Sequence, residues 1–514
     1  MFDLIITTGL RANTFLLIGV GIVACFAAGR IWRRFGSREF PTRAQATSLV
    51  LIVIILMIGL LIGRRPDWDE IEHIHTAWLM HQGLIPYSDF FQNHPPGLWL
   101  LLSPIMDILP KNGMICDFIR TLALALSGCI LWVSIRLARH LWHERGTGLM
   151  VTLLVLGQAV SLELYNLRPD LLANLLALGG VWCLFAGNSS RRFLGAGLLM
   201  GIAFSITPRL WFLFPWILLW LFWEALRGMH CWRQVAAFAG GAIGGLIPLA
   251  LYLFSNSLTK DFVHWTYLFN ISGDFVAKGH FPLVVTGLAA WGCIDAMRSS
   301  NPENRARVNL LVFGFILSAA CYTVQPNHDL QYGQQFFGFL AAVLAAGPAV
   351  YIVRRLIIPG RMTAILLALA FVLWQPLQAI QHWVRDGGYL RGRAEIARLM
   401  EIADGESVVC VPPGHPIFAA NATFLSHPWQ LYYWLDRPDV RIPLKGIAAD
   451  IIQSKPVIIL DRPLEGRPAL IDILKQKKII TLDEYETLRD FLASNYELID
   501  IGFHKYWVRR NRLD

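Results

Sequence analysis

Residues 64–70, Arg-Arg-Pro-Asp-Trp-Asp-Glu, come directly after an apolar run of spanning length and contain three carboxylates. A carboxylate can accept the proton of an attacking hydroxyl, so Asp69 and Glu70 are candidates for general-base catalysis. Ionisable groups are costly at the end of a membrane helix, and functional sites often hold them there. A purely structural alternative is that Asp69 is the N-cap of the next helix. The local sequence supports both interpretations.

The residues after these acids predict two short helices joined by an ordered loop. Residues 70–82 place Ile71, Ile74 and Trp78 on one helical face, which predicts an amphipathic helix lying on the membrane. The loop is rich in aromatic and polar residues and ends in the pair Pro95-Pro96, which fixes a rigid turn. We interpret the apolar run 97–109 that follows as a helix at the outer interface, because counting it as a span would place later Arg-rich loops outside.

This loop resembles the first external loop of the GT-C glycosyltransferases. The similarity is strongest to the protein O-mannosyltransferases and their bacterial relatives, including the lipid A aminoarabinose transferases. Those mannosyltransferases carry an Asp-Glu pair, then Phe-Phe-Asp and His-Pro-Pro-Leu-Gly. This chain carries Asp69-Glu70, then Asp89-Phe90-Phe91 and His94-Pro95-Pro96-Gly97. Its Asp precedes the Phe pair and no Leu precedes the Gly, and the tail carries no motif of the family.

The resemblance implies an enzyme that transfers a sugar from a polyprenyl-phosphate carrier to an acceptor hydroxyl on a lipid, glycan or protein. It implies that Asp69 acts on the acceptor as a base or orienting group, and that Glu70 shares this role or binds the sugar. His94 stands where the aminoarabinose transferases have a Lys suited to a lipid phosphate. An inverting transfer without a cofactor is expected. The need for a divalent metal stays open, since the distant oligosaccharyltransferases use one.

A phosphate leaving group requires cations or hydrogen-bond donors around it. The predicted outer turns supply the candidates Arg120, Arg168, Asp170, Arg209, His328 and Tyr332. Arg120 matches an Arg common at the start of this span in the family, and the turn at 168–170 resembles that of many relatives. Singly, such side chains more often anchor helix ends at the lipid headgroups. Their shared location with Asp69 on one predicted face favours a single site.

The composition predicts a polytopic membrane protein. The 514 residues are 55% hydrophobic and only 16% charged, against about 25% charged in average soluble proteins. This excludes ordinary cytosolic, fibrous and disordered classes. The tail 380–514 has as many basic as acidic residues, so the net charge of +9 lies in the first 379 residues. We assign that charge to cytosolic loops rather than to nucleic-acid binding.

About twelve apolar runs have lengths near that of a membrane span. They lie near 14–32, 46–63, 117–137, 148–164, 171–187, 194–206, 210–226, 235–254, 282–297, 308–325, 334–353 and 363–380. Arg-rich loops alternate with loops poor in basic residues, which predicts that both termini and the loop 64–116 lie outside.

The sequence therefore predicts three regions. Residues 1–45 form an extra N-terminal transmembrane helix and a basic cytosolic loop. Residues 46–380 form the transmembrane catalytic domain of GT-C type. In residues 381–514, β-branched runs alternate with helical stretches, which predicts a small α/β domain in the periplasm, next to a bacterial inner membrane.

Other functions remain open at this point. A multi-span transporter fits the number of spans, but such proteins usually show two matching halves and none is visible. A non-catalytic scaffold of envelope glycan assembly is a further alternative, against which the pair Asp69-Glu70 argues. Among enzymes, the alternative is a lipopolysaccharide or glycan polymerase-like transferase. The eight cysteines lie mostly in apolar runs and form neither a disulfide framework nor a zinc pattern.

Overall fold

The computed structural model describes residues 64–158, 162, 164–210, 212–227, 232–269, 283–299, 302–324, 330–355, 381, 385, 387–425, 446–462 and 468–513. The predicted N-terminal region (residues 1–45) and the predicted spans 46–63 and 363–380 lie outside these residues, as does the candidate His328.

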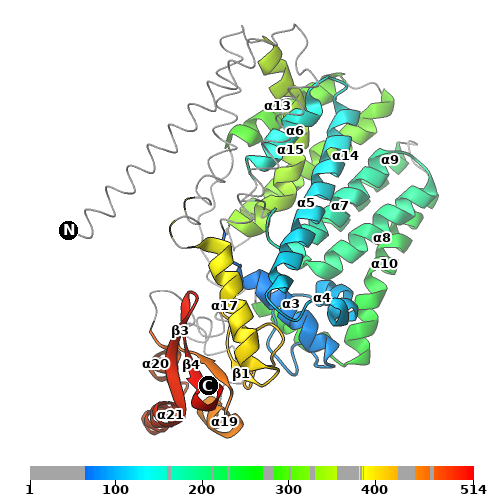
Figure 1. Ribbon diagram of the computed structural model, residues 1–514. Helices are drawn as coiled ribbons and strands as arrows, with labels where there is room; N and C mark the ends of the chain where they lie inside the picture. The colour runs from blue at the N-terminus through cyan, green and yellow to red at the C-terminus, as the bar shows by residue number, and fades with distance from the viewer. Residues whose placement is uncertain are drawn as a thin grey trace.

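Long apolar helices form the body of the molecule (Figure 1). They are α5 (Met114–Leu141), α6 (Thr147–Leu156), α7 (Pro169–Phe185), α8 (Ser190–Ile206), α9 (Leu213–Leu226), α10 (Trp232–Ser255), α13 (Leu283–Ser299), α14 (Pro302–Val324) and α15 (Leu330–Arg355). Within the described ranges, Met114–Leu141, Pro208–Leu226, Trp232–Ser255 and Phe336–Arg355 are long and apolar enough to cross a membrane. The chain is an integral membrane protein, and the total of twelve spans stays a prediction.

The predicted span 148–164 does not form one continuous helix. Helix α6 ends at Leu156, and a turn follows at Gly157 and Gln158. Glycine disfavours helix continuation, and the Gln158 side chain donates back to the Leu154 carbonyl at 2.9 Å. The helix is therefore too short to cross the hydrocarbon core by itself.

Glycines allow α8 to pack closely against α10 and against the first external loop. A Cβ at Gly197 would lie 2.0 Å from the Phe238 carbonyl oxygen of α10, so only glycine permits this approach. At the C-terminal end of α8, a Cβ at Gly97 would lie 2.3 Å from the Ser205 carbonyl oxygen. Gly97, which follows the Pro pair, thus lets the loop pack against the end of α8, close to Thr207.

The external loop contains α3 (Trp68–His81), α4 (Gly97–Leu102) and the 3₁₀ helix η1 (Ser103–Ile108). Helix α3 covers nearly the predicted range 70–82. The run 97–109 is broken where η1 begins at Ser103-Pro104, and its two pieces are together shorter than the roughly 20 residues of a span. This agrees with the interpretation that the run does not cross the membrane.

The prediction that α3 is a surface amphipathic helix is wrong. Its polar residues Glu72, His73, His75 and Thr76 are as buried as the apolar residues beside them. Protein covers both faces because residues of the tail pack on the polar side, where His75 Nδ1 lies 2.6 Å from the Ile417 carbonyl oxygen.

The tail forms a four-stranded sheet with helices around it, at the end of the molecule where α3 and α4 lie (Figure 1). Its elements are α17 (Gly388–Ala403), β1 (Val408–Val409), α19 (Ile447–Ser454), β2 (Ile458–Leu460), α20 (Leu470–Gln476), α21 (Leu482–Asn495), β3 (Tyr496–Ile501), β4 (His504–Arg509) and η4 (Arg510–Arg512). The strand order is β1-β2-β4-β3, with β1 and β2 parallel and the other pairs antiparallel. The division of the chain into domains stays a prediction.

Candidate functional site

The start of α3 is fixed by a capping box made by Asp67 and Glu70. Asp67 is the N-cap, with extended backbone, and its side chain accepts from the Glu70 N–H. Its Oδ1 also accepts from the Trp68 N–H at 2.7 Å. Glu70 Oε2 accepts from the Asp67 N–H at 2.9 Å. These reciprocal bonds satisfy backbone donors that a helix start leaves open. The interpretation of Asp69 as the N-cap is therefore wrong, and its carboxylate is available for another role.

Glu70 also forms a buried ion pair with Arg120 of α5. Arg120 Nη2 lies 3.1 Å from Glu70 Oε2 and 2.8 Å from the Arg65 carbonyl oxygen. Burial raises the pKa of Glu70, and the guanidinium of Arg120 offsets part of that rise. Glu70 is thus held by a cap and a cation on its Oε2, which gives it a structural role.

Asp69 forms an ion pair with Arg168, the residue before α7. The Arg168 side chain is only 3% exposed, and it also lies 3.9 Å from Asp67 Oδ2. Asn166 Nδ2 donates to the same Asp67 oxygen at 2.8 Å. The turn before α7 therefore supplies both a cation and an amide donor to the acids at the start of α3.

Asp170 and Arg209 form a third pair beside these two. Arg209 Nη1 lies 2.7 Å from Asp170 Oδ2, and Thr207 Oγ1 donates to Asp170 Oδ1 at 3.1 Å. Asp170 sits in the first turn of α7, where a carboxylate is favoured by the helix dipole. Arg209, in η2 (Pro208–Leu210), is 28% exposed and is the most accessible cation of the three.

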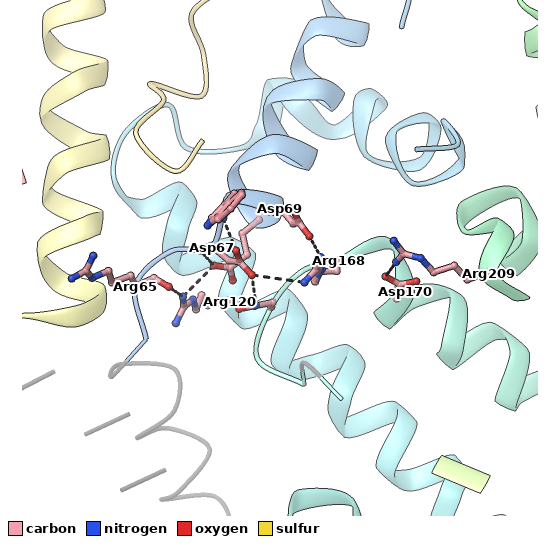
Figure 2. A network of polar contacts seen from close by, with 10 residues as sticks. Arg65, Asp67, Asp69, Arg120, Arg168, Asp170 and Arg209 are labelled. Carbon is pink, nitrogen blue, oxygen red and sulfur yellow. Dashed lines mark hydrogen bonds and ion pairs between the residues drawn. The ribbon is translucent and has the colours of Figure 1, made fainter. Parts of the chain in front are cut away.

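Figure 2 shows these groups as one network that runs from Arg65 and Arg120 through Asp67, Asp69 and Arg168 to Asp170 and Arg209. The side chains come from α3, α5, the start of α7 and η2, so distant segments of the chain converge here. A row of alternating guanidinium and carboxylate groups can exchange an internal partner for a substrate anion. It can also offer a carboxylate as a proton acceptor.

His94 borders the same network from the loop between α3 and α4. Its ring lies 5.1 Å from that of His73, measured between centroids, and its backbone carbonyl accepts from the Tyr87 hydroxyl at 2.5 Å. Burial and the neighbouring His73 lower the pKa of His94 to about 3. His94 is therefore a neutral hydrogen-bonding group near neutral pH and cannot supply the charge of a Lys.

The structure brings together seven of the predicted site residues: Asp69, Glu70, His94, Arg120, Arg168, Asp170 and Arg209. Tyr332 falls near the start of α15, and His328 lies outside the described residues. Sequence reasoning missed Asp67, Asn166 and Thr207 as members of the network. Among the residues that the structure describes, no group of three or more His, Cys, Asp or Glu is arranged to hold a metal ion.

The tail packs directly against the elements that carry the network. Asp117 of α5 accepts from the Tyr389 hydroxyl at 2.7 Å and pairs with Arg393 at 2.8 Å. Arg120 lies over the Tyr389 ring, with 4.7 Å between the guanidinium carbon and the ring centroid. Helix α17 therefore supports the segment of α5 that positions Arg120.

A turn of the tail also holds the segment that precedes α3. The Phe503 ring contacts two guanidinium groups, and its centroid lies 3.9 Å from the Cζ of Arg65 and 4.7 Å from that of Arg391. Buried Glu395 fixes this turn by accepting from the Phe503 N–H at 2.8 Å and the Tyr506 hydroxyl at 2.6 Å. Because the Arg65 carbonyl is a partner of Arg120, the turn is linked to the network.

Phe503→Ala is expected to lower stability by about 1–2 kcal/mol, because two cation–π contacts of roughly 0.5–1 kcal/mol each are lost. The rate of the sugar transfer that the first-loop resemblance implies should fall several-fold as residues 65 and 66 lose their support. Thermal unfolding in detergent and kcat should be measured together. Phe503→Tyr should restore both, and Leu498→Ala, on the exposed side of the same hairpin, serves as the control. An unchanged kcat in Phe503→Ala would show that the turn does not act on the site.

Buried histidines between α3 and the tail predict a stability loss in acid. The His75 and His415 rings are in contact, with their centroids 3.9 Å apart and their planes tilted by 41°. Burial lowers the pKa of His75 to about 4 and that of His415 well below its usual value. The unfolded chain binds these protons near pH 6.5 and the folded chain does not. Stability is therefore full above pH 6.5 and falls as the pH drops below it, by about 1.4 kcal/mol per pH unit and group.

Thermal unfolding measured from pH 7.5 to pH 5 should show this loss. The raised pKa of Glu70 has the opposite effect, because it adds stability as the pH falls. This single group is outweighed by the buried histidines, whose pKa values are lowered. His415→Gln should flatten the curve, whereas His140→Gln, which changes an exposed histidine, should leave it unaltered. A curve that stays flat in the native sequence would contradict the burial of neutral imidazoles at this interface.

No protein-family profile and no curated protein matches the chain. Its structure is similar to the crystal structure of ArnT from Cupriavidus metallidurans bound to undecaprenyl phosphate, with 14% identity and a TM-score of 0.57. The apo structure of the same ArnT gives 12% identity and a TM-score of 0.56. Each comparison covers 90% of this chain and 97% of the ArnT chain. The chain therefore has the GT-C glycosyltransferase fold that its first-loop motif predicts.

Proposed function

We propose that this protein transfers a sugar from a polyprenyl-phosphate carrier to an acceptor hydroxyl at the Asp69 network. The observation that carries the proposal is the row of paired guanidinium and carboxylate groups on a fold shared with ArnT. One ArnT structure holds undecaprenyl phosphate, which supports a lipid-linked donor for this chain. The acceptor is a hydroxyl of a lipid, a glycan or a protein.

In the proposed reaction Asp69 is the general base. The acceptor oxygen forms a bond to the anomeric carbon while the bond from that carbon to the phosphate oxygen breaks. The phosphate leaves with the electron pair, and the Asp69 carboxylate takes the hydroxyl proton. A single displacement of this kind inverts the anomeric centre. Glu70 positions the start of α3 through the cap and Arg120, so it acts through Asp69 rather than on the proton.

Arg168 links the two halves of this reaction. Its guanidinium is paired with Asp69. The donor phosphodiester competes for the same guanidinium with two non-bridging oxygens that share one negative charge, and bidentate contacts of this kind are strong. Transfer of Arg168 from Asp69 to the phosphate stabilises the leaving group and frees the carboxylate to accept a proton. Arg209 and neutral His94 supply further donors on the exposed side of the network.

The proposed site faces the side of the membrane away from the cytosol, where nucleotide sugars are absent and a lipid carrier is required. Single-cysteine variants at positions 112 and 145, both exposed, lie at opposite ends of the helix bundle. A membrane-impermeant thiol reagent added outside intact cells should label Asn112→Cys and leave Arg145→Cys unlabelled until the cells are opened. The reverse pattern would place the network in the cytosol.

Binding of the carrier tests the proposal without knowledge of the acceptor. Undecaprenyl phosphate at about 100 times its Kd should stabilise the purified protein by about 2.7 kcal/mol, seen as a rise in Tm. Undecaprenol, which lacks the phosphate, and a nucleotide sugar should have little effect. Arg168→Gln should abolish most of the rise. Stabilisation by the nucleotide sugar alone would contradict a lipid-linked donor.

A further inference from the structure

A cavity of about 480 Å³ lies at the end of the bundle away from the Asp69 network. Its walls come from the last turn of α5, the turn that follows, and the first turn of α6. Figure 1 shows α6 at the far end of the bundle from α3 and α4. The cavity is therefore a separate feature of the molecule, and the proposed transfer reaction does not use it.

The position of the cavity along α5 corresponds to the opposite membrane surface. From Arg120 in the network to Arg139 in the cavity wall, α5 rises about 28 Å at 1.5 Å per residue. The hydrocarbon core of a bilayer is about 30 Å thick. Because α5 is long and apolar enough to span a membrane, a network at one headgroup level places the cavity at the other.

The cavity wall is cationic. Arg139 and Arg145 line it, together with His143. Glu144 is the one carboxylate of the lining, and Arg354 of α15 lies 3.1 Å from its Oε2. Arg354 also donates to the Arg145 carbonyl at 2.8 Å, which fixes the turn. Arg354 thus offsets the negative charge of Glu144, and the lining as a whole carries more positive than negative charge, which favours an anion.

The start of α6 adds backbone donors to these cations. Gly146 is the N-cap, has a φ of 97° that favours glycine, and provides no side-chain cap. The positive end of the α6 dipole therefore opens on the cavity. The Arg139 guanidinium lies against this first turn, since a Cβ at Gly148 would be 3.0 Å from its Nη2 and 3.2 Å from its Nε.

The cavity has a rigid apolar side as well. The Trp142 indole packs on Gly347 of α15, where a Cβ would lie 2.4 Å from the ring, and its Nε1 donates to the Val343 carbonyl at 3.0 Å. Helix α15 therefore holds the ring in place next to the cationic wall. A polar wall beside an aromatic surface at headgroup depth suits an anionic head attached to an apolar chain.

We propose that this cavity binds a phosphate group, with Arg139 and the first turn of α6 as its ligands. The shared chemistry is that of phosphate oxygens. The depth of the cavity favours the phosphodiester of an anionic phospholipid as their source, and a soluble phosphate is the second source to be separated by experiment.

Native mass spectrometry of the full chain in detergent tests the site with phosphatidylglycerol, phosphatidylcholine and inorganic phosphate as probes. Phosphatidylglycerol should be retained over phosphatidylcholine. Arg139→Gln should weaken this retention about tenfold. Gly148→Ala should also weaken it, because the added Cβ displaces the Arg139 guanidinium from the first turn of α6. Alanine favours the helix, so this change should leave α6 itself intact. Arg191→Gln, a basic residue at the same end of the bundle but outside the cavity, is the matched control and should bind normally.

The outcomes separate the two sources. Phosphatidylglycerol binding that depends on Arg139 supports a lipid site. Inorganic phosphate binding with the same dependence, and no lipid selectivity, supports a phosphate site filled from solution. Equal retention of every probe by the native chain and by Arg139→Gln overturns the proposal. Undecaprenyl phosphate binding at the Asp69 network should persist in Arg139→Gln, so failure of either site is seen independently of the other.

Discussion

Asp69→Asn is expected to reduce sugar transfer by roughly 10²–10⁴-fold while the protein keeps its fold, because an amide cannot accept the acceptor proton. Asp67, not Asp69, caps α3, so the substitution removes no cap. The Asn side chain keeps an oxygen that can accept from Arg168. Transfer rate and Tm should be measured on the same preparation, so that a loss of activity is separated from a loss of structure.

Two matched variants decide the assignment. Asp107→Asn changes an exposed carboxylate that pairs with His81 at the far end of α3, and it should leave the rate unaltered. Glu70→Gln should mainly lower Tm, since Glu70 holds the helix start and Arg120. If Asp69→Asn keeps the native rate while Glu70→Gln is inactive, Glu70 is the base. If both variants keep the native rate, the network is not the site of transfer.

Arg168→Gln is expected to lower the transfer rate by roughly 10²–10³-fold, the usual effect of removing a donor to a charge that develops in the transition state. It should also destabilise the protein by up to about 3–5 kcal/mol, because it leaves Asp69 and Asp67 without their buried cation. Arg168→Lys keeps the charge but loses the planar fork, so its transfer rate should lie between that of the native protein and that of Arg168→Gln.

The double variant Asp69→Asn/Arg168→Gln separates catalysis from stability. Removing both partners of the Asp69–Arg168 pair leaves Asp67 as the one carboxylate of the two without its cation. The double variant should therefore recover part of the Tm lost in Arg168→Gln. Its transfer rate should stay as low as that of the worse single variant. Recovery of both Tm and rate would show that the pair has only a structural role.

Arg209 is more exposed than Arg120 and Arg168. Arg209→Gln should therefore raise KM more than it lowers kcat.

Much of the candidate site could be predicted because its signals are local. The run of acids after an apolar stretch pointed to Asp69 and Glu70, and short turns between apolar runs pointed to Arg168 and Arg209. The capping box was visible as well, since Asp67 and Glu70 have the D-x-x-E spacing in which N-cap and N3 residues bond reciprocally. Capping preference alone does not choose between Asp67 and Asp69, and the choice of Asp69 ignored that spacing.

The remaining features depend on contacts between distant segments. His75 contacts Ile417, which is 342 residues away in the chain. The periodicity of residues 70–82 does not indicate that the tail covers the polar face of this helix. The pairing of each Arg with one carboxylate depends on how α5, α7 and η2 meet α3, which a motif does not encode. The Phe503 contact with Arg65 likewise links the two ends of the described chain. Such pairs become visible only when the helices have their positions in space.

Turnover of a polyprenyl-phosphate-linked sugar tests the central claim most directly. The purified chain, reconstituted in liposomes with the lipid-linked sugar and a cell-envelope extract as the source of acceptor, should release polyprenyl phosphate and form one glycosylated product per carrier released. Asp69→Asn in the same liposomes should release it at least 10²-fold more slowly. Equal release by the native and Asp69→Asn proteins, or efficient transfer from a nucleotide sugar in liposomes without the lipid-linked sugar, would contradict the account.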